Sequence, residues 1–340
     1  MPLRDGLASH SKLWPLKKTN AVRCACSSRL PTRMSSSSKA VAVFFDAPHF
    51  DDYPFEPTAG NYYPDSYAEL GAILGERGHS FYIVRGQETY RGHNIFSRGW
   101  KFDGTKFQDH PQAITVDRIY NKGAFVADEQ ARLLNSVEME SICMNKHKTY
   151  EMFPQLMSPS MVVHNAQEAW KALTHLTTGL IVAKPLTGCE GRGIIIASRE
   201  TVARSLPSFP YLLQEFMDTS DGIPGLTHTK HDFRTVIING EVIDAYIRIP
   251  KDGSLLANVA QGGSLKPVAI DAIPAEVLAI LRQVEASFSM FGTRVYALDV
   301  CRQKNGIWKI IEINAQPGLP ERIEPNFQRF LSRLTDVLVA

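Results

Sequence analysis

The chain has 340 residues, of which 44% are hydrophobic, 21% charged and 9% aromatic, a composition typical of a globular protein with two or three domains. No apolar run approaches the roughly 20 residues that a membrane-spanning helix needs. The net charge is +2, but residues 1–39 hold eight of the 37 basic residues and one of the 35 acids, which leaves the rest at −5. The body of the chain therefore lacks the basic surface of a nucleic-acid-binding protein.

Residues 1–39 form a leader that is rich in Arg, Lys and Ser and ends near four serines at 35–38. Without a central apolar stretch it is not a secretory signal, and its composition is that of an organelle transit peptide. A disordered tail and a translation start at Met34 are the alternatives. We expect an intracellular protein, in a chloroplast or mitochondrion if the leader is a transit peptide and in the cytoplasm otherwise. The three cysteines outside the leader show no metal-ligand spacing, which fits a reducing compartment.

Residues 40–140 have the strand–helix–strand order of a small α/β domain. The apolar run at 41–45 predicts a buried strand, the spacing at 66–78 predicts a helix, and 80–84 predicts the next strand. A further strand is expected at 114–120. Because no Gly-x-Gly-x-x-Gly run is present, we assign no nucleotide to this Rossmann-like unit.

The remainder of the chain alternates helices with paired strands. Helices are predicted at 145–157, 166–176, 275–291 and 326–338, and strands at 211–217, 233–238 and 241–247. The last two strands are joined by Asn239-Gly240, which is a strong hairpin signal.

A glycine-rich loop lies between two apolar β-branched runs at 181–196. Gly188, Gly191 and Gly193 allow backbone N–H groups to converge on phosphate oxygens, and Lys184 adds a positive charge. The loop is neither a Walker loop nor a dinucleotide fingerprint. An ordinary glycine-rich hairpin turn is the alternative interpretation.

Three hard oxygen ligands occur on two further predicted strands near the end of the chain, one at 299–300 and one at 311–314. Asp299, Glu312 and Asn314 offer carboxylate and amide oxygens, and Glu312 and Asn314 are two residues apart, so they share one face of a strand. This set suits Mg²⁺, with Mn²⁺ as an alternative, and such a sparse site requires phosphate oxygens to complete it.

Taken in order, these motifs resemble the ATP-grasp superfamily, above all bacterial glutathione synthetases and the ligases that add glutamate to ribosomal protein S6. The resemblance covers about residues 141–325. It rests on Asn145-Lys146, Ala183-Lys184-Pro-Leu-x-Gly188, Gln214-Glu215-Phe216, Asp232-Phe-Arg234, Arg248-Ile-Pro, Asn258-x-x-x-Gly262-Gly263, Asp299 and Glu312-Ile-Asn314-x-x-Pro317-Gly318. It implies an α/β (α+β) protein with an ATP-grasp domain at 141–340, preceded by the Rossmann-like α/β domain at 40–140.

The resemblance also implies how ATP is held. Lys146 and Lys184 would bind its phosphates together with the three glycines, the strand end 214–216 would hold the adenine largely through backbone groups, and Asp232 would bind a ribose hydroxyl. Each has a plainer alternative: a solvated helix charge for Lys146, an ordinary edge strand for 214–216, and a surface ion pair for Asp232.

Arg234, Arg248 and Asn258 would form the catalytic set. By the same resemblance, the two arginines would sit over the transferring phosphoryl group, and Asn258 would bond the phosphate or a substrate carboxylate. Two arginines on neighbouring strands could also be surface charges.

The implied function is an ATP-dependent ligase that converts a carboxylate to an acyl phosphate and joins it to the amine of an amino acid or peptide. The glycine loop at 187–193 would act as a lid that excludes water. Pro317-Gly318-Leu319 favours the amino-acid and glutamate ligases. A non-catalytic ATP-binding regulator and a phosphotransferase are the alternatives. Neither nucleic acid nor a membrane is expected as a partner, and a homo-oligomer is compatible with the family.

Overall fold

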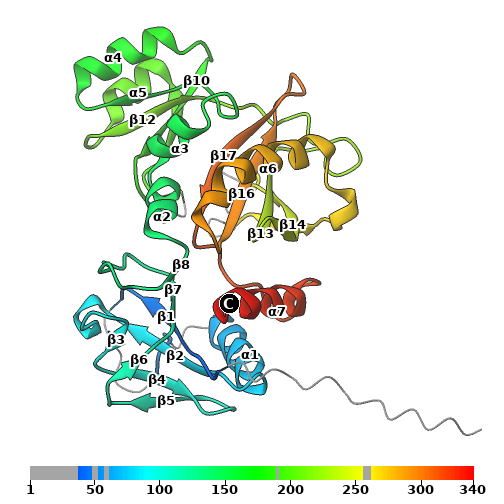
Figure 1. The fold of residues 1–340 in the computed structure, drawn as a ribbon. Coiled ribbons are helices and arrows are strands. Elements are labelled where there is room, and N and C mark those ends of the chain that lie inside the picture. The colour runs from blue at the N-terminus through cyan, green and yellow to red at the C-terminus, as the bar shows by residue number, and fades with distance from the viewer. Residues whose placement is uncertain (1–36, 48–52, 57–60, 189–190, 256–261) are drawn as a thin grey trace, which may run out of the picture. The chain divides into compact units, whose positions relative to one another are not determined.

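The structure of the protein is a computed structural model, and it describes residues 37–47, 53–56, 61–188, 191–255 and 262–340 (Figure 1). The leader up to residue 36 and the predicted catalytic residue Asn258 lie outside the described residues. Residues 38–340 form one compact unit. Within the part of the chain that is described, no helix is both long and apolar enough to cross a membrane.

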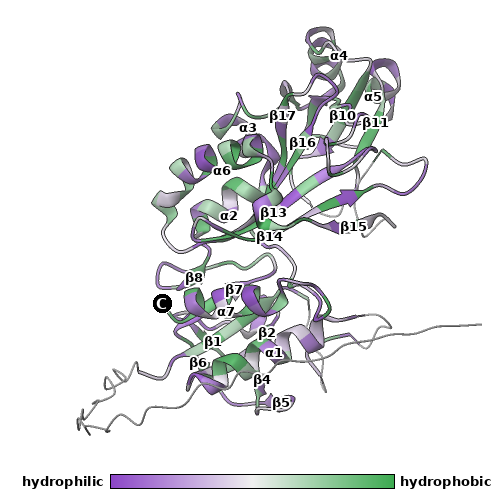
Figure 2. Cartoon of the chain, turned by 90° about the vertical axis from the view of Figure 1, so that its right-hand side faces the viewer, coloured by the Kyte–Doolittle hydropathy of each residue, from purple (hydrophilic) through white to green (hydrophobic). Residues whose placement is uncertain are grey.

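The first sheet has the strand order β5-β4-β2-β1-β7-β8. Its strands are β1 (Ala40–Phe45), β2 (Ser80–Arg85), β4 (Gly99–Phe102), β5 (Phe107–His110), β7 (Arg118–Asn121) and β8 (Leu133–Leu134). Strand β1 lies parallel to β2 and β7 and is coloured green in Figure 2, because it is apolar on both faces. Helix α1 (Tyr63–Glu76) connects β1 to β2 and completes the expected βαβ unit.

The second sheet is antiparallel, with the order β11-β10-β12-β9. It contains β9 (Ser160–Val163), β10 (Leu180–Pro185), β11 (Ile195–Ser198) and β12 (Tyr211–Glu215), and its helices are α4 (Ala166–His175) and α5 (Arg199–Ser205). The apolar side chains of both helices pack with those of the strands in one cluster. The glycine-rich segment connects β10 to β11, as the sequence predicts. Two short helices, α2 (Val137–Met144) and α3 (Lys146–Met152), precede this sheet along the chain.

The third sheet is also antiparallel, with the order β15-β14-β13-β16-β17. It contains β13 (Asp232–Ile238), β14 (Glu241–Ile249), β15 (Ser264–Pro267), β16 (Val295–Arg302) and β17 (Trp308–Asn314). Helix α6 (Ala275–Phe288), which carries both green and purple residues in Figure 2, buries its apolar face in one core with Phe233 and Ile237. The opposite face of the sheet contributes Val236 and Ile238 to a second core.

That second core also contains the last helix, α7 (Phe327–Leu338). Phe330 and Leu334 of α7 belong to the same buried cluster as Val43 of the first sheet and Leu70 of α1. Hydrophobic packing therefore joins α7 to elements near the start of the described chain. The division at 140/141 stays a prediction, and α7 packs against elements on both sides of it.

Three predicted elements differ from the structure. The single strand expected at 114–120 is two strands, β6 (Ile114–Thr115) and β7, in different sheets. The residues between them diverge, because the N–H of Val116 bonds to the Asn94 carbonyl and that of Asp117 to the Ala40 carbonyl. Strand β6 instead pairs with β3 (Ile95–Phe96).

The two other differences are helix ends. The helix expected at 145–157 ends at Met152, because Pro154 lacks an N–H group and disfavours helical geometry in the residue before it. The helix expected at 275–291 ends at Phe288 and continues as the 3₁₀ turn η4 (Ser289–Phe291).

The position of α7 predicts a large effect of Phe330→Ala. This ring is 1% exposed within the shared core, so its truncation is expected to lower the free energy of unfolding by about 3–5 kcal/mol. Urea denaturation measures the change, with exposed Gln328→Ala in the same helix as the control. Equal midpoints for the two variants would contradict the packing of α7.

Candidate active site

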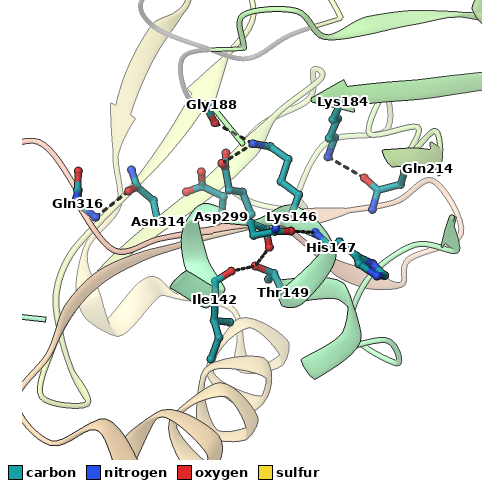
Figure 3. Close-up of polar contacts among 12 residues, drawn as sticks. Ile142, Lys146, His147, Thr149, Lys184, Gly188, Gln214, Asp299, Asn314 and Gln316 are labelled. Carbon is teal, nitrogen blue, oxygen red and sulfur yellow. Dashed lines mark hydrogen bonds and ion pairs between the residues drawn. The ribbon is translucent and has the colours of Figure 1, made fainter. Parts of the chain in front are cut away.

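Lys146 is positioned by a helix cap. The side-chain oxygen of Asn145 accepts hydrogen bonds from the N–H groups of His147 and Lys148, which starts α3 at Lys146. The Lys146 ammonium donates to the Gly188 carbonyl at 2.8 Å (Figure 3). It also lies 3.7 Å from Oε1 of Glu312. The Asn145-Lys146 pair thus links the glycine loop to the strand that carries the predicted metal ligands.

Lys184 lies on β10 and is 7% exposed. Its ammonium donates to Oε1 of Gln214 at 2.8 Å (Figure 3). The amide nitrogen of Gln214 in turn donates to the Ser160 hydroxyl at 2.9 Å. Burial lowers the pKa of Lys184 to about 8, although the negative charge of Glu312 opposes the shift. The two lysines therefore lie within the electrostatic reach of one carboxylate.

The space next to these lysines is small. A cavity of about 20 Å³ is lined by Lys146, Pro185, Thr187, Gly188, Gly191, Arg192, Ile194 and Glu312. This volume admits little more than one water molecule. A triphosphate can occupy it only if the loop moves. Gly188, Gly191 and Gly193 all have positive φ, and a Cβ on Gly193 would lie 2.9 Å from the ring of Pro185, so the loop geometry requires glycine.

Arg234 and Arg248 converge on one buried carboxylate. Asp299 is fully buried and accepts from Nε and Nη2 of Arg234 and from Nη2 of Arg248, each at 2.6 Å. Burial alone would raise the pKa of Asp299, but the two guanidinium charges outweigh it and hold the pKa below its ordinary value. Asp299 is therefore ionised at neutral pH, and both arginines are fixed by charge-assisted hydrogen bonds.

Asp232 belongs to the same cluster. Strand pairing places it opposite Arg248, which donates to its Oδ2, while its Oδ1 is buried without a hydrogen-bond partner. Burial raises the pKa of Asp232, against the opposing charge of Arg248. Asp232 is 7% exposed, so the alternative that it forms an ordinary surface ion pair is wrong. The side chains of Arg234 and Arg248 are 12–14% exposed, so the alternative that they are surface charges is also wrong. Binding of a ribose by Asp232 stays a prediction.

The three predicted metal ligands occupy adjacent positions on β16 and β17. Asp299 pairs with Glu312 and Ala297 pairs with Asn314, so the three side chains share one face of the ladder. The amide oxygen of Asn314 accepts from the N–H of Gln316 at 2.8 Å, which fixes the orientation of the amide (Figure 3). Among the described residues, no group of three or more His, Cys, Asp or Glu could hold a metal ion, so a metal here depends on the amide oxygen of Asn314.

The donor set fits a hard divalent cation. Glu312 and Asn314 present oxygens on the ladder face, whereas both oxygens of ionised Asp299 accept hydrogen bonds from the two arginines, so its coordination of a metal stays a prediction. Mg²⁺ takes one or two carboxylates and completes its shell with water and phosphate oxygens. Glu312 and Asn314 would therefore hold the ion, with Asp299 behind them.

The polar groups of the strand end 214–216, which is predicted to hold adenine, already have partners within the protein. The side chain of Gln214 holds Lys184, and the Glu215 carboxylate accepts from the N–H and the hydroxyl of Thr177. The N–H groups of Glu215 and Phe216 bond to the carbonyls of Pro159 and Leu180. These two residues therefore offer adenine no free backbone donor in this structure, and their contact with adenine stays a prediction.

Sequence reasoning missed the residues that hold the turn after Asn314. The Lys122 ammonium donates to the Gln316 carbonyl, and the side-chain amide of Gln316 donates to the Gly123 carbonyl. The side-chain amide of Asn135 donates to the Ala315 carbonyl. Gln316 lies within the motif that ends at Pro317-Gly318, so the sequence could have pointed to it as a residue that holds this turn. Lys122 and Asn135 are isolated polar residues of the segment that follows β7, and no sequence signal connects them to the site.

Comparisons with known proteins support the resemblance to the ATP-grasp superfamily. A model of the RimK-like ATP-grasp domain matches residues 146–327, more than half of the chain. A probable alpha-L-glutamate ligase of Legionella pneumophila is 36% identical over 155 residues, which cover 43% of this chain and 46% of the relative. One from Shewanella pealeana is 24% identical over 277 residues, which cover 75% and 57%. The chain thus spans about half the length of the curated relatives that it matches.

Solved structures share the fold at low sequence identity. The D-alanyl-alanine synthetase A of Vibrio cholerae aligns with a TM-score of 0.59 at 11% identity over 89% of this chain and 98% of that one. An ATP-grasp RimK domain protein of Sphaerobacter thermophilus aligns with a TM-score of 0.57 at 12% identity over 88% and 98%. The fold is that of the ATP-grasp ligases, and the chain belongs to the RimK-like ATP-grasp family.

Proposed function

We propose that the protein is an ATP-dependent carboxylate–amine ligase. The observation that carries the proposal is the arrangement of two lysines, two arginines and three oxygen donors on β10, β13, β14, β16, β17 and the start of α3. The lysine and arginine side chains are cationic groups suited to phosphate, and the oxygen donors suit the divalent cation that accompanies it.

One group of residues would bind ATP, and a second group would neutralise the charge that is transferred. Lys146, Lys184 and the glycine loop would hold the ATP phosphates, and Arg234 and Arg248 would stabilise the charge on the transferring γ-phosphoryl group. Glu312 and Asn314 would hold the divalent cation, which would supply positive charge next to the phosphates when bound. The substrate carboxylate would attack the γ-phosphorus to give an acyl phosphate and ADP. An amine would then displace phosphate and form the amide.

We propose L-glutamate as one of the two reactants, with an amino acid or peptide as the other. The support is the name of the relatives, probable alpha-L-glutamate ligase, together with the Pro317-Gly318-Leu319 turn. Closure of the loop at 187–193 would protect the acyl phosphate from water. A regulator that binds ATP without turnover, or a phosphotransferase, would lack the amide product.

The direct test uses protein that begins near residue 40, with Mg-ATP, L-glutamate and pools of amino acids and dipeptides. Phosphate release that depends on the pool, with a product mass equal to both reactants minus water, is the expected result. ATP binding without phosphate release from any pool would oppose the ligase proposal. Phosphorylation of a substrate without an amide would identify a phosphotransferase.

Glu312→Gln is expected to remove the carboxylate that faces both lysines and the metal. Phosphoryl transfer should fall by about two to three orders of magnitude, while the unfolding temperature stays close to that of the wild type. The matched control is Glu276→Gln, at an exposed position on α6. Unchanged turnover in Glu312→Gln would refute the metal assignment.

The lowered pKa of Lys184 predicts a pH-dependent affinity for nucleotide. With a pKa of about 8, Lys184 loses its positive charge as the pH rises from 7 to 9, so metal-free affinity for ATP should fall over this range. Lys184→Arg should remove the dependence, because guanidinium stays charged. Calorimetric titration at several pH values measures both, and a flat wild-type profile would show that Lys184 does not bind phosphate.

The lowered pKa of Lys184 also makes the stability of the nucleotide-free protein depend on pH. The free energy of unfolding should rise with pH, whereas the affinity for ATP should fall. The pKa of Lys184 is lower in the folded protein than its ordinary value of 10.5, so the unfolded chain binds more protons between about pH 8 and 10. The cost of charging buried Lys184 is fully present below pH 8 and is relieved as the pH rises through that range. Lys184→Met should remove this contribution to the pH dependence of unfolding.

A further inference from the structure

The turn that follows Asn314 is held by side chains of the first domain. The Lys122 ammonium, just after β7, donates to the carbonyls of Gln316 at 2.9 Å and Pro317 at 2.5 Å. The side-chain amide of Gln316 donates back to the Gly123 carbonyl at 3.0 Å. Fully buried Asn135 donates to the Ala315 carbonyl at 2.7 Å. Every residue from 315 to 317 thus has a backbone carbonyl bonded to the segment 122–135.

The same turn fixes the amide of Asn314. Gln316 accepts from Lys122 with its carbonyl and donates from its N–H to Oδ1 of Asn314 at 2.8 Å (Figure 3). That N–H requires an oxygen, not an NH₂ group, so it decides which amide atom points toward the turn and how the side chain is rotated. A chain of two hydrogen bonds therefore connects the Lys122 ammonium to the predicted metal ligand.

We propose that Lys122 is a positioning residue for the metal site, acting through Gln316 on the ligand oxygen of Asn314. The proposal rests on the proposed function only in taking Asn314 as a metal ligand. Lys122 would touch neither metal nor nucleotide. Partners of metal ligands orient the ligand and contribute to metal affinity even though they lie outside the coordination shell.

The surroundings of Lys122 favour this role over that of a surface charge. Lys122 is partly buried, its ammonium lies 5.2 Å from the ring centre of Tyr120, and its charge interacts with Glu140 on α2. The Glu140 carboxylate in turn accepts from the side-chain amide of Asn121 at 2.6 Å. Burial lowers the pKa of Lys122 to about 7, against the charge of Glu140. Perturbed groups of this kind cluster at functional sites.

The test compares Lys122→Met with a matched lysine elsewhere. Lys39 donates to two successive backbone oxygens, the Val339 carbonyl at 2.6 Å and an oxygen of Ala340 at 2.9 Å, so Lys39→Met removes a similar pair of lysine bonds away from the site. Binding of Mn²⁺ is followed by electron paramagnetic resonance in the presence of β,γ-imido-ATP. Affinity for this analogue without metal and the unfolding temperature are measured in parallel.

Lys122→Met is expected to weaken Mn²⁺ binding about 10–100-fold while changing metal-free affinity for the analogue by less than about threefold. Lys39→Met should change neither. The proposal is overturned if Mn²⁺ affinity in Lys122→Met stays within about threefold of the wild type, or if both affinities fall by the same factor. Should Lys122→Met not fold, Lys122→Gln, which keeps a neutral donor, is measured against the same criteria.

These readouts separate the proposal from the proposed function. Metal binding is measured without a carboxylate or an amine, so a wild-type protein that forms no amide can still show the effect of Lys122. Conversely, amide formation by the wild type together with unchanged Mn²⁺ affinity in Lys122→Met would keep the ligase and reject the positioning role.

Discussion

The candidate site depends on one buried interaction, the pairing of Asp299 with Arg234 and Arg248. These residues come from three adjacent strands, β16, β13 and β14, and both guanidinium groups bond to one carboxylate that water does not reach. Removing one partner of such a group leaves an uncompensated buried charge, which costs about 3–5 kcal/mol. The interaction therefore fixes the arginine side chains before any ligand arrives, and two positive charges share one firmly ionised carboxylate. An anion that enters next to them meets an electrostatic field that is already oriented.

The other parts of the site are organised around this face of the third sheet. The ladder between β16 and β17 places Glu312 and Asn314 beside Asp299, and Glu312 lies 3.7 Å from the ammonium of Lys146 on α3. The second sheet supplies Lys184 and the glycine loop. The segment 122–135 supplies Lys122 and Asn135, which bond to the turn after Asn314. Each part of the chain thus contributes residues whose positions depend on the others.

Sequence reasoning succeeded where local pattern and chemistry agree. The hairpin at Asn239-Gly240, the βαβ unit and the strands predicted at 233–238 and 311–314 all follow from alternation and turn residues that act over short distances. The grouping of Arg234 with Asp299 follows from the strand register, which the sequence alone does not give. Lys122 could not be recognised, because its partners are carbonyl oxygens almost 200 residues away that carry no side-chain signature. The break between β6 and β7 was missed for a similar reason, since it is set by hydrogen bonds to Asn94 and Ala40.

The packing of α7 has a consequence for how the chain folds during synthesis. The first sheet can form its strand pairings early, but its core also contains Phe330, Leu334 and Leu338 of α7, and the residues of this helix are synthesised after the other members of the core. Until then an apolar surface over α1 stays open to water, and contacts of such large sequence separation form slowly. The first sheet and α1 are therefore expected to need chaperone protection until α7 has been made, because α7 completes the core that they share.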